Sequence, residues 1–203
     1  MTDSPVLFPE GSSSSTSLGL LDRARERDAA AWQRLRELYE PLICHWCRLA
    51  GLQPADMADV QQDVFTSVLK HLPRFQREAT GGFRGWLRTI TRSKIADLFR
   101  RNRVVARGAL AQPDLLEVPA QAPVDPDAAG LSAERRLLYR RAMEIIEREF
   151  EERTWKTFWR VVIDGAAPAD VARDFNTTVN AVYLAKSRVL ARLHEEFVGI
   201  IDD

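Results

Sequence analysis

The chain has 203 residues, and its 29 Lys and Arg residues are balanced by 29 Asp and Glu residues. With 45% hydrophobic and 29% charged residues, the composition is that of a soluble globular protein with one domain or two small ones. The apolar runs are far shorter than the roughly 20 residues of a membrane span, and the amino terminus has no signal-peptide pattern, so we expect a cytoplasmic protein.

The neutral total hides an uneven distribution of charge. Residues 21–110 contain 17 bases and 10 acids, whereas residues 111–130 contain four acids and no base. The remaining segments, 1–20 and 131–203, have net charges of −2 and −1. A basic first half in a neutral chain suggests a polyanionic partner.

The first predicted elements are a tail and a helical segment. Residues 1–17 are rich in serine and have no hydrophobic period, so we expect a disordered tail. From Leu18 apolar residues recur at helical spacing, and we expect Pro41 to kink or divide this helix and Gly51 to end it. A second helix begins with Pro54 in its first turn and carries an apolar stripe at i, i+4, i+8 and i+12: Val60, Val64, Val68 and Leu72.

The segment 83–103 combines an apolar sector with many basic residues. On a helix the apolar sector contains Phe83, Trp86, Leu87, Ile90 and Leu98. Arg84, Arg88 and Arg92 follow a neighbouring stripe that we expect to be exposed. Like charges at this spacing repel one another, and nucleic-acid phosphates would relieve the repulsion. A solvated amphipathic face would show the same pattern.

Residues 108–130 contain four prolines, four acids and no base, which predicts a stiff, extended linker. Helical patterns resume after it and continue to the end of the chain. Because no segment alternates with period two between turn signals, we predict an all-α fold with two small helical domains.

Residues 168–190 have the pattern of a helix-turn-helix. Pro168 can open the first helix, small Ala172 permits close crossing, and Asn176 can adopt the left-handed conformation of a tight turn. Either Thr177 or Thr178 can cap the second helix. An ordinary helical hairpin with a surface leucine is the alternative interpretation.

The second helix of this motif has two distinct faces. Val182, Ala185, Val189 and Leu193 share one face, which we expect to be buried. The opposite face presents residues that suit the major groove of DNA, where apolar groups meet thymine methyls and arginine meets guanine: Asn180, Tyr183, Leu184, Ser187 and Arg188.

Together, three segments resemble a bacterial sigma factor of the sigma-70 family, of the extracytoplasmic-function (ECF) type. They are DVQQDVF (59–65), FRGWLRTITRSKIADLFRR (83–101) and NTTVNAVYLAKSRVLARL (176–193). The resemblance implies sigma region 2 over residues 18–107, a linker over 108–130 and sigma region 4 over 131–203. The family would direct transcription initiation by core RNA polymerase, with no enzymatic activity and no cofactor of its own.

The resemblance also assigns residues to partners. It implies contact with core polymerase by Asp59, Gln62, Asp63 and Thr66. It implies recognition and melting of the promoter −10 element by Phe75, Thr80, Arg84, Arg88, Arg92, Ser93, Arg100 and Arg101, with Phe75 stacking on a flipped base. It assigns −35 recognition to Asn180, Tyr183, Leu184, Ser187 and Arg188. Ser93 stands where the family often has Asn, and Asn176 stands in place of the usual turn Gly.

Three other interpretations compete with this one. A stand-alone helix-turn-helix regulator would bind duplex DNA without polymerase, and an adaptor would bind only protein. The pair Cys44 and Cys47 has the spacing of half a zinc site, but no second Cys/His pair accompanies it, so we interpret both as small core residues and expect no metal. The sequence leaves open the promoter, the inducing signal and whether an anti-sigma factor binds.

Overall fold

The computed structural model describes residues 19–76, 82–109 and 128–197, and these residues are helical with no strand. The predicted all-α class is therefore confirmed. None of the described helices is long and apolar enough to cross a membrane. The predicted tail and most of the predicted linker lie outside the described residues. The helices are α1 (Leu20–Arg25), α2 (Ala29–Leu49), α3 (Pro54–His71), η1 (Leu72–Arg74), α4 (Gly82–Ala109), α5 (Ala128–Glu147), α6 (Glu152–Val162), α7 (Pro168–Asp174) and α8 (Val179–Phe197).

The break in the first helical segment does not fall at Pro41, as the sequence predicted, but at residues 26–28. Arg27 has a left-handed backbone with φ of 63°, which ends α1. Asp28 then caps α2, because its Oδ1 accepts hydrogen bonds from the backbone nitrogens of Ala30 at 2.8 Å and Ala31 at 3.2 Å. From there α2 continues through Pro41 to Leu49.

A side chain from a distant helix supports α2 at Pro41. Proline has no N–H, so the carbonyl of Glu37, four residues earlier, lacks its helical donor. Arg141 of α5 fills this role, since its Nε donates to that carbonyl at 2.9 Å. The proline is thus tolerated in the helix interior where α5 packs on α2.

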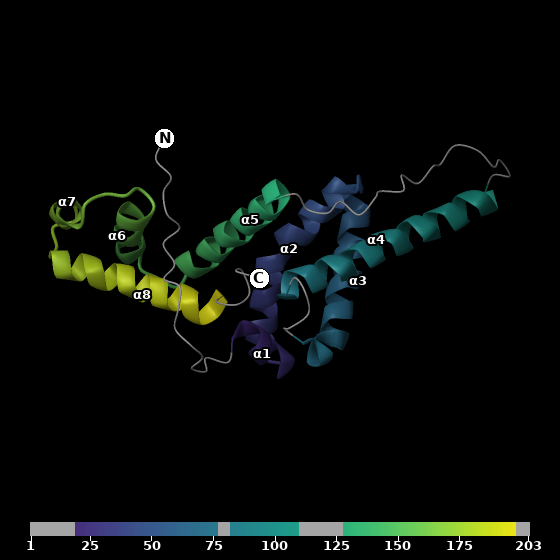
Figure 1. Cartoon of the computed structure of the whole chain (residues 1–203), viewed down its shortest axis with the longest axis horizontal. Helices are drawn as coiled ribbons and strands as arrows, with labels where there is room; N and C mark the ends of the chain where they lie inside the picture. Colours follow the sequence, from purple (N-terminus) through teal and green to yellow (C-terminus); the bar gives the residue numbers. More distant parts are fainter. Residues whose placement is uncertain (1–18, 77–81, 110–127, 198–203) are drawn as a thin grey trace.

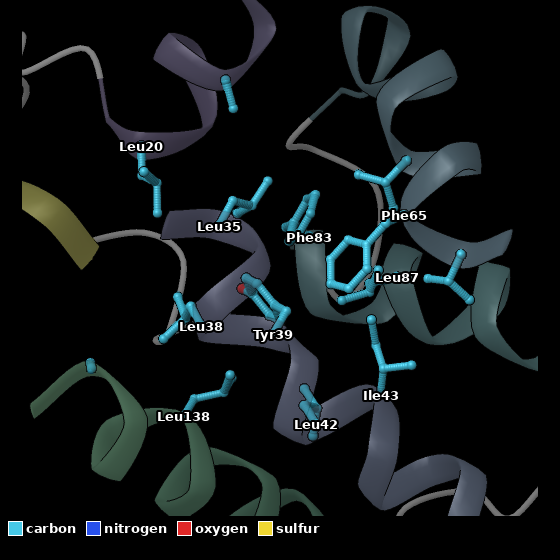
Figure 2. Close-up of a cluster of buried hydrophobic side chains, with 14 of the residues drawn as sticks. Leu20, Leu35, Leu38, Tyr39, Leu42, Ile43, Phe65, Phe83, Leu87 and Leu138 are labelled. Atoms are coloured by element: carbon cyan, nitrogen blue, oxygen red, sulfur yellow. The ribbon is translucent and has the colours of Figure 1, made fainter. Parts of the chain in front are cut away.

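Helix α2 lies at the centre of the molecule (Figure 1). Helices α3 and α4 pack together and against α2, while α5 also packs on α2 and is linked through α8 to α6 and α7. Figure 2 shows the side chain of Leu138 from α5 on one side of α2. The side chains of Phe83 and Leu87 lie on the opposite side of α2. One buried apolar cluster therefore contains side chains from both halves of the chain. A second, small cluster holds Val171, Ala172 and Val182.

Several local predictions are confirmed. Val60, Val64, Val68 and Leu72 are all buried, as the apolar stripe predicted. Pro54 opens α3, and Gly51, with φ of 75°, follows the end of α2. In the segment predicted to be a helix-turn-helix, Pro168 opens α7 and Asn176 is left-handed with φ of 46°. These features depend on a few neighbouring residues, which is why the pattern alone predicts them.

The structure decides which threonine caps α8. Thr178 Oγ1 accepts from the backbone nitrogen of Ala181 at 3.1 Å. Thr177 contributes its backbone nitrogen, which donates to the carbonyl of Ala172 at 2.8 Å, a bond that any residue except proline can make. The cap is therefore a property of the Thr178 side chain.

We predict that Thr178→Ala lowers the free energy of unfolding by about 1 kcal/mol, because the first turn of α8 loses its side-chain acceptor. Thr177→Ala, one residue away, should change it by less than about 0.5 kcal/mol. Urea titrations followed by circular dichroism measure both. Equal losses in the two variants would contradict the assignment of the cap.

Candidate nucleic-acid interface

The outer face of α8 is exposed along its length. Asn180, Tyr183, Leu184, Ser187 and Arg188 all lie on it, while Val182 and Val189 on the opposite face are fully buried. Tyr183 and Leu184 are 54% and 48% exposed. Large side chains with this much exposure leave a surface that can pack into a groove of DNA.

The turn before α8 is held by contacts that the sequence pattern did not predict. Arg153 of α6 donates from Nη2 to the carbonyls of Phe175 and Asn176, the second at 3.3 Å. Arg160 of α6 also pairs with Asp174 at 3.1 Å. These contacts of α6 with residues 174–176 hold the start of the turn that leads into α8.

Three of the four residues assigned to polymerase, Asp59, Gln62 and Asp63, line a groove between α3 and α4, and Thr66 lies outside it. Asp59, Gln62 and Thr66 are exposed, and Thr66 Oγ1 donates to the Gln62 carbonyl of its own helix at 2.8 Å. Asp63 pairs with Arg101 of α4 at 3.4 Å. The groove has a volume of about 400 Å³ and is lined by Asp56, Asp59, Gln62, Asp63, Leu98, Arg101 and Asn102. The residues predicted for polymerase thus meet Arg101, which was predicted for DNA.

The basic residues of α4 fall into two groups. Arg92, Ser93 and Arg100 are exposed, and Arg100 pairs with Asp97 on the same helix. Arg84, in contrast, is only 7% exposed, and Arg88 is partly buried. The expected exposed stripe of arginines is therefore wrong for Arg84 and Arg88, because Glu134 of α5 pairs with both side chains. Their contact with DNA stays a prediction.

The group that covers them is the carboxylate of Glu134 on α5. Glu134 Oε1 accepts from Arg88 Nη2 at 2.6 Å and from Trp46 Nε1 at 2.8 Å. Its Oε2 lies 3.9 Å from Arg84 Nε. Burial lowers the pKa of the Arg84 guanidinium below its usual value, and Glu134 partly offsets this effect.

Phe75 does not present an exposed ring, contrary to its predicted role in stacking on a base. It is buried, with ring centroids 4.9 Å from Trp86 and 5.6 Å from Phe83. Its carbonyl accepts from Arg25 Nη2 at 2.5 Å. Phe75 therefore closes an aromatic cluster where the chain leaves η1. Thr80 lies outside the described residues.

Comparison with known families decides the nature of the first half. Residues 35–104, from α2 to α4, match the family model described as Sigma-70 region 2. This part of the chain is therefore similar to a sigma-70 region 2 domain. The match ends before α5, so it does not include the predicted helix-turn-helix.

The chain was also compared with curated proteins and with solved structures. No curated protein matches the chain. Among solved structures, a chain of the structure described as the RsbN–BldN complex is similar at 17% sequence identity and a TM-score of 0.36, covering 85% of this chain and 96% of that one.

An ion network joins the first half of the chain to the second half, at the end of α5 away from Glu134. Glu196 of α8 is buried and pairs with Arg23 at 2.9 Å and Arg192 at 2.7 Å. Glu149, just after α5, pairs with Arg34 of α2 and with Arg192 at 2.7 Å. The partners are far apart in sequence, so no periodicity could have predicted them.

This network sets the pKa of Glu149. Burial alone would raise it, but hydrogen bonds from Arg34 and Arg192 outweigh burial and leave the pKa below its ordinary value of 4.5. Because the pKa is lower in the folded than in the unfolded state, the unfolded state binds the proton more readily. The contribution to stability is therefore full above about pH 4.5 and is lost as pH falls through the folded pKa.

We predict that the free energy of unfolding of Glu149→Gln decreases less than that of the wild type when the pH is lowered. Urea midpoints measured from neutral pH to below pH 4.5 should fall less steeply than in the wild type, because the titrating group is gone. Glu147→Gln, at the exposed end of α5, provides the matched control and should keep the wild-type slope. Identical slopes for wild type and Glu149→Gln would contradict the prediction.

The cysteines of the region 2 domain are part of helix packing, as interpreted from the sequence. Cys47 is fully buried, and burial together with the neighbouring Cys44 raises its pKa to about 11. Gln61 Nε2 of α3 donates to Cys44 Sγ at 2.7 Å. Within the part of the chain that the structure describes, no group of three potential metal ligands comes together.

Proposed function

We propose that this chain is a sigma factor of the ECF type, which binds core RNA polymerase and directs it to promoters through their −10 and −35 elements. The observation that carries the proposal is the sigma-70 region 2 match, because that domain occurs here in one chain with a helix-turn-helix. The exposed outer face of α8 supports −35 recognition, and the polar groove of α3 and α4 supports contact with polymerase.

Promoter opening by such a protein needs no covalent chemistry. Polymerase would hold region 2 and the helix-turn-helix at a fixed separation, so that two weak DNA contacts act at high effective concentration. The exposed Arg92 and Arg100 would then neutralise phosphates of the opened strand. A cytoplasmic location follows from this role, and binding of an anti-sigma factor stays a prediction.

Reconstituted transcription tests the proposal. The purified chain is mixed with bacterial core RNA polymerase and a library of promoter fragments, and the transcripts are sequenced. We expect initiation at a defined set of promoters only when the chain is present. Tight binding to duplex DNA without polymerase, together with no stimulation of transcription, would instead support a stand-alone helix-turn-helix regulator.

A further inference from the structure

Glu134 occupies a site built from three donors on two helices of region 2. The carboxylate is only 2% exposed. Trp46 of α2 and Arg88 of α4 both donate to its Oε1, and Arg84 of α4 lies on the side of its Oε2. The Arg88 guanidinium also lies 5.6 Å from the centroid of the Trp46 ring, which fixes the two donors relative to each other.

The carboxylate fills this site incompletely. Its Oε1 takes two hydrogen bonds, whereas its Oε2 has no hydrogen-bond partner among the described residues. The buried Arg84 Nη1 also lacks one there. Burying a cation and a polar N–H without full pairing is costly, which indicates that the donors suit an anion with more oxygens.

We propose that Trp46, Arg84 and Arg88 form a binding site for a phosphate of single-stranded DNA, and that Glu134 occupies it in the free chain as an intramolecular competitor. The inference rests on the proposed function, since it gives region 2 the role of binding an opened strand. A backbone phosphate offers two unesterified oxygens plus ester oxygens on a tetrahedral centre, so all three donors can be satisfied together.

A nucleic-acid strand suits the site better than a free phosphate. Arg92 follows Arg88 by one helical turn and is exposed, whereas Arg100 and Arg101 further along α4 pair with Asp97 and Asp63. A strand that places one phosphate at the site can therefore place others along the same helix. The site then becomes the buried end of a basic surface that continues at the exposed Arg92.

Glu134 lowers the affinity of the chain for DNA, because α5 must move away from α2 and α4 before a phosphate can reach the three donors. The apparent dissociation constant is the intrinsic constant divided by the fraction of molecules that are open. Closure is held by contacts remote from the site: the bond from Arg141 to the Glu37 carbonyl and the Glu196 network. A weaker Glu134 contact should raise the open fraction without removing any donor from the site.

The experiment measures binding of a fluorescein-labelled, single-stranded oligonucleotide of random sequence to the full chain, by anisotropy at low salt and without polymerase. We expect Glu134→Gln to bind at least about tenfold more tightly than wild type. Glu147→Gln removes the same charge from the end of the same helix, where the side chain is exposed, and should change affinity less than about twofold. Equal affinities for the two variants would overturn the proposal.

Second substitutions test which groups form the site. Adding Arg88→Gln or Trp46→Phe to Glu134→Gln should reverse most of the gain, because each removes one donor. A full gain in the Trp46→Phe background would contradict the three-donor site. Inorganic phosphate at millimolar concentration should displace little oligonucleotide; complete displacement would indicate a free-phosphate site and contradict the assignment to DNA.

Folding and function are separated by two further measurements. Circular dichroism checks that Glu134→Gln keeps its helices, and Glu134→Asp, which keeps the charge on a shorter side chain, should show an intermediate gain in affinity. Reconstituted transcription with the wild-type chain tests the sigma role alone. A tenfold gain without any transcription would refute the proposed function only. Transcription without the gain would refute the phosphate site only.

Discussion

The double variant Arg88→Glu plus Arg92→Glu is expected to lose promoter opening by about a hundredfold or more, while its affinity for core RNA polymerase stays within about twofold of wild type. A hydrogen bond to a charged group contributes about 1.5–3 kcal/mol. Two such contacts with phosphates amount to about 3 kcal/mol or more, and each 1.4 kcal/mol is about tenfold in rate. Polymerase binding should persist because Asp59 and Gln62 lie in the groove of α3, away from both substitutions.

Charge reversal elsewhere provides the matched control. Arg140 of α5 and Arg148 just after it are exposed, and neither is among the residues predicted to bind DNA. Arg140→Glu plus Arg148→Glu changes net charge by the same amount and should lower opening by less than about threefold. Open-complex formation is measured by permanganate footprinting, and polymerase binding by native gel shift. Loss of both activities in the Arg88/Arg92 variant, or of neither, would contradict the assignment.

The single variant Arg92→Glu tests the loss of a DNA contact without disturbing the ion pair between Arg88 and Glu134. Arg92 is exposed, whereas Arg88 pairs with Glu134. Reversal of Arg92 alone should therefore lower promoter opening by about tenfold without altering the α5 contact. Wild-type opening by Arg92→Glu would show that the loss in the double variant comes from Arg88 alone.

The sequence predicted those features of the fold that short-range rules determine. The apolar stripe of α3, the proline at its start, Gly51 after α2 and the left-handed Asn176 each depend on residues a few positions apart. Backbone conformation and helical period are enough to place them. The exposed face of α8 follows from the same geometry, because its buried face is strongly apolar.

The predictions from sequence were wrong where a residue far away in the sequence supplies a contact that local patterns do not contain. Pro41 was expected to kink or divide its helix, and it does not divide it. Arg141, which follows Glu37 by 104 positions in the sequence, donates to the Glu37 carbonyl that the proline leaves without a donor. Arg84 and Arg88 were expected to be exposed because arginine usually is. Glu134 pairs with both from another helix, so tertiary contact overrides that preference.

Leu138→Ala is expected to lower the free energy of unfolding by about 3 kcal/mol, the largest effect on stability predicted here. Leu138 is fully buried, and its side chain lies in the same apolar cluster as residues of α2, α3 and α4. Truncation removes three carbon atoms from a packed core and leaves a cavity. Leu184→Ala makes the same chemical change on the exposed face of α8 and should cost less than about 0.5 kcal/mol. Urea unfolding measures both.

Native-state hydrogen exchange of Leu138→Ala then shows how the two halves are coupled. Because the cluster is shared, amides of α2 and α3 should lose protection together with those of α5 and α8. If only α5 to α8 lost protection, the halves would unfold independently, and the contact through Leu138 would be a docking of two separate cores. The shared cluster also explains why opening of the Glu134 site costs free energy: α5 cannot leave Arg84 and Arg88 without exposing Leu138 to water.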